Sequence, residues 1–270
     1  MKRRLWQIIS TVIQNGYIPG YVGFKLYDGV LKGFCVPTLN CYACPGAFGS
    51  CPIGVLQNFI AQRMIPYFVL GFLGLVGAGV GRMTCGWLCP IGLLQDILKK
   101  ISRRTVKIPK WMGYLKYVAL VGLALLLPFF LMETWYCKLC PAGALEGGIP
   151  WAAGGALGAD AMAGLAVGYF FWLKMALLAG FILAMVFIKR PFCRTFCPLG
   201  AIFSFFNKIS LVRLRLEESK CNECGFCARV CPVDLNAYKE LDSLECIKCL
   251  DCTRCPTGAI KASFGLGGKL

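Results

Sequence analysis

Apolar residues gather in four long stretches, separated by loops that carry most of the charged residues. Three stretches cover residues 64–81, 111–131 and 169–188. Each approaches the roughly 20 predominantly apolar residues that a helix needs to cross the hydrocarbon core of a bilayer. A fourth stretch, at residues 5–22, is shorter and partly polar. The pattern predicts an α-helical integral membrane protein with about four spans.

The composition supports this class. Apolar residues make up 57% of the 270-residue chain and charged residues only 16%, with a mean hydropathy of +0.64. In a soluble protein the net charge of +16 would suggest a nucleic-acid partner. Here the basic residues gather in particular loops and form no stripe interleaved with aromatic residues. The sequence therefore argues for membrane topology and against nucleic-acid binding.

The charges of the loops orient the spans. The loop over residues 82–110 carries seven basic residues against Asp96 alone, and the tail from Lys189 is also basic. The loops 23–63 and 132–168 are close to balanced. Because cytoplasmic loops hold the excess of Lys and Arg, we expect a multi-pass protein of a prokaryotic cytoplasmic membrane. Both termini and the 82–110 loop are then cytoplasmic, and no cleavable signal peptide is expected.

Eight of the eighteen cysteines lie between residues 221 and 256, spaced C-x2-C-x2-C-x3-C-P and C-x2-C-x2-C-x2-C-P. This segment resembles a bacterial two-cluster ferredoxin domain, in which the fourth cysteine of each run binds the other cluster. That rule gives one [4Fe–4S] cluster to Cys221, Cys224, Cys227 and Cys255, and a second to Cys246, Cys249, Cys252 and Cys231. One residue is missing before the last cysteine of the second run. Residues 211–270 are therefore predicted to form a two-cluster ferredoxin-like α+β domain in the cytoplasm.

The membrane part contains an internal duplication. The motif R-x2-C-x3-C-P-x-G occurs at residues 82–92 and 190–200, and C-x2-C-P occurs at 41–45 and 137–141. Residues 1–210 thus divide into two parallel two-span units, about 1–110 and 111–210. Two matching cysteine pairs supply the four thiolates of a [4Fe–4S] cluster. The predicted inner-face ligands are Cys85, Cys89, Cys193 and Cys197, and the predicted outer-face ligands are Cys41, Cys44, Cys137 and Cys140.

Other chemistries remain open for these cysteines. Four thiolates can bind structural zinc, and on the outer face disulfides are a further alternative. Cys51 could replace a member of the outer set as a ligand, and Cys35 could be an inert buried thiol. Arg82 and Arg190 occupy equivalent repeat positions, where they could tune a cluster potential or act only as positive-inside anchors.

The chain contains no histidine, which excludes b-type haem because that cofactor needs axial histidines. Nothing in the sequence identifies a flavin or quinone site, although either group could take part. Iron–sulfur chemistry is what the residues favour, with two [4Fe–4S] clusters in the tail and up to four in all.

With these motifs the chain resembles the NapH-like membrane iron–sulfur proteins, polyferredoxin-type subunits related to the membrane portions of the NosR and CcoG groups. The resemblance covers residues 60–260 approximately. It implies a quinol dehydrogenase or electron-relay subunit of a larger redox complex, with its ferredoxin domain in the cytoplasm. The outer cysteine set goes beyond that basic pattern.

We therefore expect an electron relay between a soluble cytoplasmic donor or acceptor and quinone or an outer-face acceptor. The alternative is a redox-sensing or metal-reducing accessory protein that supports another metalloenzyme. A hydrocarbon core about 30 Å thick is too wide for rapid direct tunnelling between its faces. Either the inner and outer sites approach each other inside the bundle, or a quinone, flavin or partner subunit bridges them.

Overall fold

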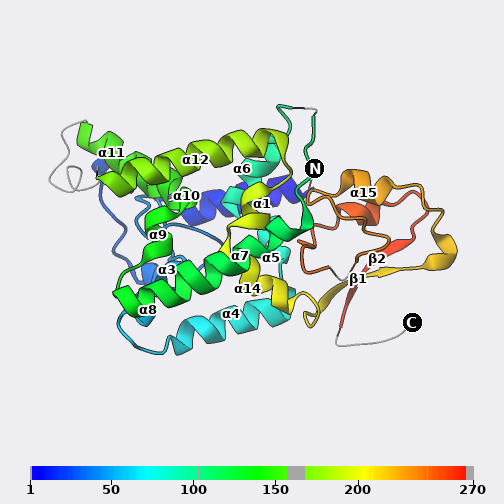
Figure 1. The fold of residues 1–270 in the computed structure, drawn as a ribbon, viewed down its shortest axis with the longest axis horizontal. Coiled ribbons are helices and arrows are strands. Elements are labelled where there is room, and N and C mark those ends of the chain that lie inside the picture. The colour runs from blue at the N-terminus through cyan, green and yellow to red at the C-terminus, as the bar shows by residue number, and fades with distance from the viewer. Residues whose placement is uncertain (1, 103, 157–167, 242, 266–270) are drawn as a thin grey trace.

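The structure is a computed structural model that describes residues 2–102, 104–156, 168–241 and 243–265. It consists of a bundle of helices and, at one end of that bundle, a small domain over residues 211–265 that we call the tail (Figure 1). The first helix, α1 (Lys2–Asn15), begins beside the tail, where Arg3 pairs with Asp251 at 3.0 Å. The start of the chain and the tail therefore share one end of the molecule.

Among the residues that the structure describes, two helices are long and apolar enough to cross a membrane. One runs from Lys110 to Leu131 with a mean hydropathy of 2.0, and the other is α12 (Tyr169–Phe187) with 2.2. In the most apolar 18-residue part of each helix only 28% and 17% of the residues are buried, so apolar side chains face outward around most of that part. Such surface is unfavourable in water and is accommodated by lipid. The helix Lys110–Leu131 comprises four consecutive segments: η2 (Lys110–Tyr114), α7 (Leu115–Val118), η3 (Ala119–Leu126) and α8 (Leu127–Leu131).

The other two apolar stretches form shorter helices. Residues 64–81 yield α4 (Tyr67–Val80), and residues 5–22 are divided between α1 and α2 (Ile18–Gly23). Helix α1 is amphipathic, but its apolar face is exposed and its polar face is buried, the opposite of a surface helix in a soluble protein. Its apolar residues such as Trp6 and Ile13 are exposed, whereas Gln7 is completely buried. Its polar face packs on α5 (Met83–Trp87) and α6 (Pro90–Leu98).

Four of the described helices start at the proline of a Cys-Pro dipeptide. In each case the cysteine is the N-cap residue and proline follows it, because the fixed φ of proline suits the first helical turn. Glycine stands three residues after each of these cysteines. The four are α3 (Pro52–Ala61), α6, α10 (Pro141–Gly143), which continues through η4 (Ala144–Gly148) and α11 (Ile149–Ala156), and α14 (Pro198–Phe206).

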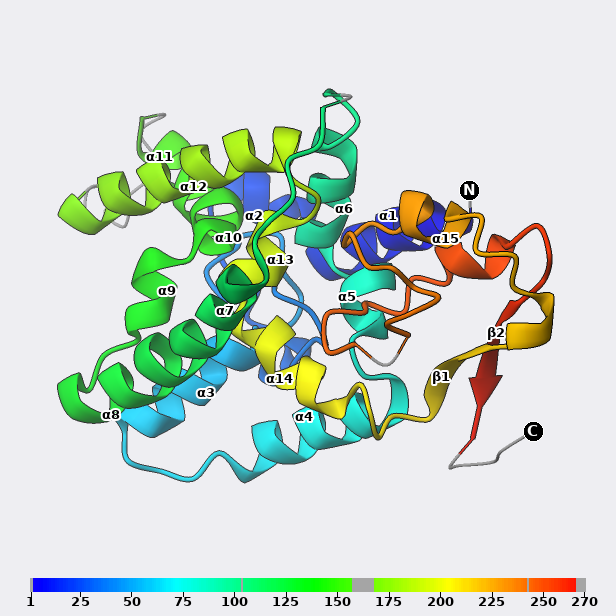
Figure 2. The same ribbon diagram turned by 45° about the vertical axis from the view of Figure 1, so that its right-hand side comes forward.

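Single-turn helices precede three of these starts and carry Cys85, Cys137 and Cys193. They are α5, α9 (Trp135–Leu139) and α13 (Pro191–Thr195). The units α5–α6 and α13–α14 have the same order and lengths of helices, five residues followed by nine. Figure 2 shows α5 beside the tail and α9 and α10 on the far side of the bundle.

The tail is closed by an antiparallel pair of strands, β1 (Val212–Leu216) and β2 (Ile260–Phe264), in which Leu214 lies opposite Ala262. Strand β1 precedes the first cysteine run and β2 follows the second, so their pairing brings the two ends of the segment together. Between them lie η6 (Glu218–Lys220), α15 (Phe226–Val230) and η7 (Asp251–Arg254). A further short turn in the bundle is η1 (Val30–Gly33).

The tail is packed on the bundle through a shared core. Buried Val233 and Ile247 of the tail belong to the same hydrophobic cluster as Phe192 and Phe203 of the bundle. The cysteines of α5, α6, α13 and α14 are part of this cluster as well. The tail therefore has a fixed position relative to the membrane cysteines.

Candidate metal centres

The structure brings the four predicted inner cysteines together. Cys85, Cys89, Cys193 and Cys197 are each at most 7% exposed, and they lie close enough to repel one another when ionised. Cys89 and Cys197 are the N-cap residues of α6 and α14. The Gly200 amide donates a hydrogen bond to the Cys197 sulfur at 3.3 Å. A helix N-terminus of this kind favours negative charge on the sulfur.

Arg82 and Arg190 brace this set symmetrically. Each guanidinium donates to the backbone carbonyl of the first cysteine in the other repeat: Arg82 to Cys193 at 3.2 Å, and Arg190 to Cys85 at 2.9 Å. Both arginines are almost completely buried. They therefore hold the two cysteine loops against each other.

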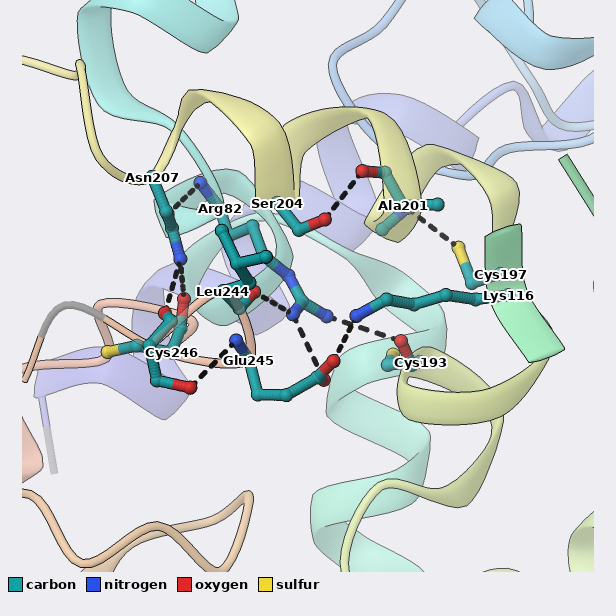
Figure 3. Close-up of polar contacts among 12 residues, drawn as sticks. Arg82, Lys116, Cys193, Cys197, Ala201, Ser204, Asn207, Leu244, Glu245 and Cys246 are labelled. Carbon is teal, nitrogen blue, oxygen red and sulfur yellow. Dashed lines mark hydrogen bonds and ion pairs between the residues drawn. The ribbon is translucent and has the colours of Figure 1, made fainter. Parts of the chain in front are cut away.

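Acidic residues balance both arginines. Arg190 forms a two-pronged ion pair with Asp96 at 2.6 and 2.8 Å. Arg82 pairs with Glu245 of the tail at 3.2 Å, and Lys116 contacts the same carboxylate (Figure 3). Burial opposes ionisation of Asp96, but the neighbouring Arg190 and Arg3 outweigh it and hold its pKa below the usual range.

The outer cysteines surround a cavity of about 540 Å³, although not in the predicted combination. The cysteines that line it are Cys41, Cys51, Cys137 and Cys140. The fourth predicted member, Cys44, is directed elsewhere. Its sulfur lies 3.4 Å from the Tyr21 hydroxyl and 3.6 Å from Asn15 Oδ1. Cys35 is buried next to Ser50, with which it forms an isolated β-bridge.

Glycines lie beside the sulfurs of this set. A Cβ atom on Gly54 would be in ordinary contact with the Cys137 sulfur at 3.7 Å, whereas one on Gly147 would lie only 3.3 Å from the Cys41 sulfur, a tight approach. Glycine at these positions leaves space beside the thiols. The residues therefore form a cradle that a bulky bound group would fill.

Two glutamines donate hydrogen bonds to cysteine sulfurs from equivalent positions. Gln95 Nε2 lies 2.9 Å from the Cys193 sulfur, and Gln57 Nε2 lies 3.4 Å from the Cys137 sulfur. Each glutamine is completely buried and lies six residues after an N-cap cysteine, in the repeated sequence C-P-I-G-x-L-Q. Our reading of the sequence missed this pair, although the seven-residue repeat was a visible signal. The same position after Cys140 holds Glu146, which accepts a hydrogen bond from the Cys41 amide at 2.6 Å.

In the tail, one of the two predicted sets converges. Cys231, Cys246, Cys249 and Cys252 line one small cavity of about 20 Å³, so a cysteine of the first run has crossed to the second. In the other predicted set, Cys227 is buried on α15. Its companions are partly or fully exposed: Cys221, Cys224 and Cys255.

The donor set suits an iron–sulfur group. In the part of the chain that the structure describes, all eighteen cysteines are free thiols, and no group of three or more His, Cys, Asp or Glu side chains converges on a single-ion site. Burial, aided by the neighbouring Cys51, raises the pKa of the Cys137 and Cys140 thiols to about 12. Such thiols ionise readily only when a cation compensates them. At the outer set, sulfurs placed around a cavity of about 540 Å³ match a cluster with several irons better than one zinc ion.

The outer set, the inner set and the tail set at Cys231, Cys246, Cys249 and Cys252 adjoin one another in series. Tyr136, next to Cys137 of the outer set, stacks on Phe196 between the inner Cys193 and Cys197, with ring centroids 5.5 Å apart. On the other side, Trp87 Nε1 donates to the Lys248 carbonyl of the tail at 3.2 Å. The inner and outer sets thus approach each other inside the bundle, which was one of the two arrangements that the sequence left open.

Two protein-family models, both described as a 4Fe-4S binding domain, match the chain. The first matches residues 62–109, 117–158 and 162–217, just over half of the chain, and the second matches residues 215–235. These matches cover the inner cysteines and the first cysteine run of the tail. They support [4Fe–4S] clusters as the bound groups.

The chain is also similar to several curated proteins. It is 27% identical to protein MJ0750 of Methanocaldococcus jannaschii over 89% of this chain and 92% of that protein. It is 26% identical to the methylamine utilization ferredoxin-type protein MauN of Methylobacillus flagellatus, over 80% and 75%. Ferredoxin-type protein NapH of Escherichia coli is 25% identical over 56% of this chain and 47% of its own length. The predicted resemblance to NapH-like proteins is confirmed, and no solved structure matches the chain.

Proposed function

This chain belongs to the 4Fe-4S binding domain family of iron–sulfur electron-transfer proteins, and from that premise we propose that it is a transmembrane electron relay. Its electrons would pass between a soluble cytoplasmic partner at the tail and quinone or an outer-face acceptor. The observation that supports this most directly is the unbroken series of cysteine sets from the tail to α9 and α10. The protein would serve as the electron-transfer subunit of a larger oxidoreductase complex.

We assign the ligands from the way the thiols converge. The inner set holds one cluster through Cys85, Cys89, Cys193 and Cys197. The outer set uses Cys51 in place of Cys44, because Cys51 lines the cavity and Cys44 is turned toward Tyr21. The tail holds the cluster bound by Cys231, Cys246, Cys249 and Cys252, and a further one at Cys221, Cys224, Cys227 and Cys255. A bound [4Fe–4S] cluster accepts and releases single electrons at a potential set by its surroundings.

The protein supplies position, charge and exclusion of water. Arg82 and Arg190 hold the two inner loops at a fixed separation, and the helix N-termini favour anionic sulfurs. Tyr136 and Phe196 fill the space between the inner and outer sets with packed aromatic rings. Water is therefore kept from the path, and the low dielectric strengthens the effect of each nearby charge.

A four-span topology with a cytoplasmic tail is consistent with the exposed faces. The helix Lys110–Leu131 and α12 meet the length requirement, and α1 with α2 and α4 would complete the four. At about 1.5 Å per residue, the 14 residues of α1 or α4 reach only part of the way across a core about 30 Å thick. Their loop continuations would complete the crossing, shielded from lipid by the bundle.

A cavity of about 780 Å³ supports the quinone end of the proposal. It lies where the helix Lys110–Leu131 meets the tail, and its walls include Tyr114, Tyr117 and Phe205. Glu245, next to Cys246 of the tail set, also lines it. An apolar pocket with aromatic walls and a few polar groups is what a small planar ligand needs.

Iron and sulfide quantification with EPR on anaerobically purified protein tests the relay. Four clusters require about sixteen irons per chain, four in each cube. Cys51→Ser should lose about four of them, and Cys137→Ser with Cys140→Ser should lose the same four. Cys44→Ser is the matched control and should lose none.

Two results would contradict the proposal. A loss of iron in Cys44→Ser with none in Cys51→Ser would restore the pairing read from sequence spacing. Iron near eight per chain, unchanged in all three variants, would confine the clusters to the tail and remove the outer end of the relay.

A further inference from the structure

A strongly basic hollow of about 530 Å³ lies where the bundle meets the tail. We call it the basic hollow. Its walls come from the start of α1, the end of α6, the end of α12, α15 and η7. Eight Lys and Arg residues line it against two acidic residues, Asp96 and Asp251. Its outward-facing cations include Arg4, Lys100, Arg229 and Arg254.

The two carboxylates of the basic hollow are already engaged. Asp96 lies between Arg3 at 2.8 Å and Arg190 at 2.6 Å. Asp251 pairs with Arg3 at 3.0 Å and is 3.9 Å from Arg254. They compensate the deeper arginines and leave the charge of the outer cations largely unopposed. The hollow therefore presents a positive field to the solvent.

The floor of the basic hollow is also the wall of a cysteine set. Cys231 lines both the hollow and the small tail cavity that it shares with Cys246, Cys249 and Cys252. Lys189 fixes this point, since its ammonium donates to the Cys231 carbonyl at 3.0 Å and pairs with Asp234 at 2.9 Å. A redox group bound in the basic hollow would thus be separated from the tail set by a single residue, Cys231.

We propose that the basic hollow is the docking site for a soluble one-electron carrier protein whose contact surface is acidic. This inference rests on the proposed relay and specifies its cytoplasmic partner. One electron passes from the reduced carrier to the tail set, or in the reverse direction, and no bond or proton is exchanged. Opposite charges steer such partners together and orient them, and the effect weakens as salt screens it.

Anionic lipid headgroups are the competing occupant, because basic residues near spans also meet the membrane surface. Two features favour a protein. Arg229 and Arg254 belong to the tail and not to a loop between spans. The shared position of Cys231 further gives this face a use in electron transfer that headgroups would obstruct.

Binding of a purified acidic two-cluster ferredoxin to the full-length protein in nanodiscs tests the proposal. The double variant Arg229→Glu with Arg254→Glu should weaken binding by about tenfold or more, and wild-type affinity should fall as salt rises. Lys100→Glu, on the bundle wall of the hollow, should weaken it less. The matched control Lys208→Glu with Lys239→Glu reverses two exposed cations outside the hollow and should bind like wild type.

Iron content and EPR spectra of every variant separate the two hypotheses. Normal spectra with lost binding support docking at the hollow, whereas absent clusters in wild type would defeat the relay itself. Equal binding by the hollow and control variants would overturn the docking proposal. Lipid binding is tested by adding phosphatidylglycerol to phosphatidylcholine nanodiscs and measuring the unfolding temperature. If this lipid raised the unfolding temperature of wild type but not of the hollow variants, while ferredoxin bound both equally, the docking proposal would also be overturned.

Discussion

The inner and outer cysteine sets are built on the same local scaffold but in different electrostatic surroundings. Both use N-cap cysteines of Cys-Pro helices, and both receive a hydrogen bond from a glutamine in C-P-I-G-x-L-Q. Around the inner set, the buried arginines Arg190 and Arg82 form ion pairs with Asp96 and Glu245, respectively. The outer set instead borders buried Glu146, whose pKa burial raises to about 8.

The difference teaches that the repeated motif fixes where sulfurs are placed, while residues outside it set their environment. Positive charge near a cluster favours its reduced form. Glu146, with its raised pKa, is mostly uncharged at neutral pH and adds little negative charge at the outer set. At the inner set, Arg3 and Lys116 join the two arginines, so the cations outnumber Asp96 and Glu245. We therefore expect the inner centre to have the higher reduction potential of the two. At equilibrium an electron would then reside on the inner cluster more often than on the outer cluster.

The strongest test of the comparison is to remove an arginine brace that only the inner set has. Arg190→Leu would leave Asp96 buried with only Arg3 as its partner, and breaking a buried ion pair from one side costs about 3–5 kcal/mol. Thermal unfolding in detergent should shift strongly downward, with loss of the inner EPR signal before the outer one.

The matched control for this change is the double variant Arg190→Leu with Asp96→Leu. Replacing both charges by apolar residues avoids a stranded carboxylate, so most of the lost stability should return. If the double variant were as unstable as the single one, charge compensation would not be the reason for the buried pair.

A smaller effect is expected where the two sets meet. Tyr136→Ala would open a cavity in the core and cost about 3 kcal/mol, and it would remove the stacking on Phe196. Tyr136→Phe keeps the ring and deletes a buried hydroxyl that interacts with the Cys140 sulfur. It should cost less than Tyr136→Ala, because one hydrogen bond contributes about 1 kcal/mol.

Freeze-quench EPR after rapid reduction from the tail side measures the passage of electrons between the sets. Tyr136→Ala should delay the outer signal relative to the inner one, and Tyr136→Phe should not. An equal delay in both variants would show that the hydroxyl, and not the packed ring, carries the contact.

The smallest effect should come from the glutamines. Gln95→Leu removes a 2.9 Å N–H···S bond and Gln57→Leu a 3.4 Å one, so the first should lower its set's potential more. One hydrogen bond is worth about 1 kcal/mol, or about 40 mV for a one-electron couple. Redox titration followed by EPR measures both shifts. A shift of the outer signal in Gln95→Leu would contradict the assignment of each glutamine to its own set.

Much of the site could be read from local spacing. The C-x3-C-P repeats identified the four inner cysteines as one group, and the structure places these thiols close together. The position of each cysteine at a helix start is local, because N-cap geometry at Cys-Pro is fixed within one helical turn. The crossing of Cys231 to the second tail run was predicted from the same kind of rule, and those four thiols do converge. The ligand roles themselves stay predictions.

Spacing was less informative for the outer set. The C-x2-C-P match favoured Cys44 as the partner of Cys41, yet the chain turns Cys44 toward Tyr21 and places Cys51 at the cavity. Of the four expected spans, two form helices of membrane-crossing length. The sequence of α1 is only partly apolar, which made its prediction as a span weak. Its apolar residues are exposed, and its glutamines are buried where α1 packs on α5 and α6.

The sequence by itself determined the class of protein, the iron–sulfur chemistry and the duplicated positions of the thiols, because hydropathy, ligand type and helix starts are local properties. Only the tertiary structure decided which helix starts converge, and that Arg82 and Arg190 reach across to the opposite repeat. It also decided that Tyr136 joins the two sets. Those contacts join residues that are far apart in the chain, and they depend on how the helices pack, which no spacing along the sequence specifies.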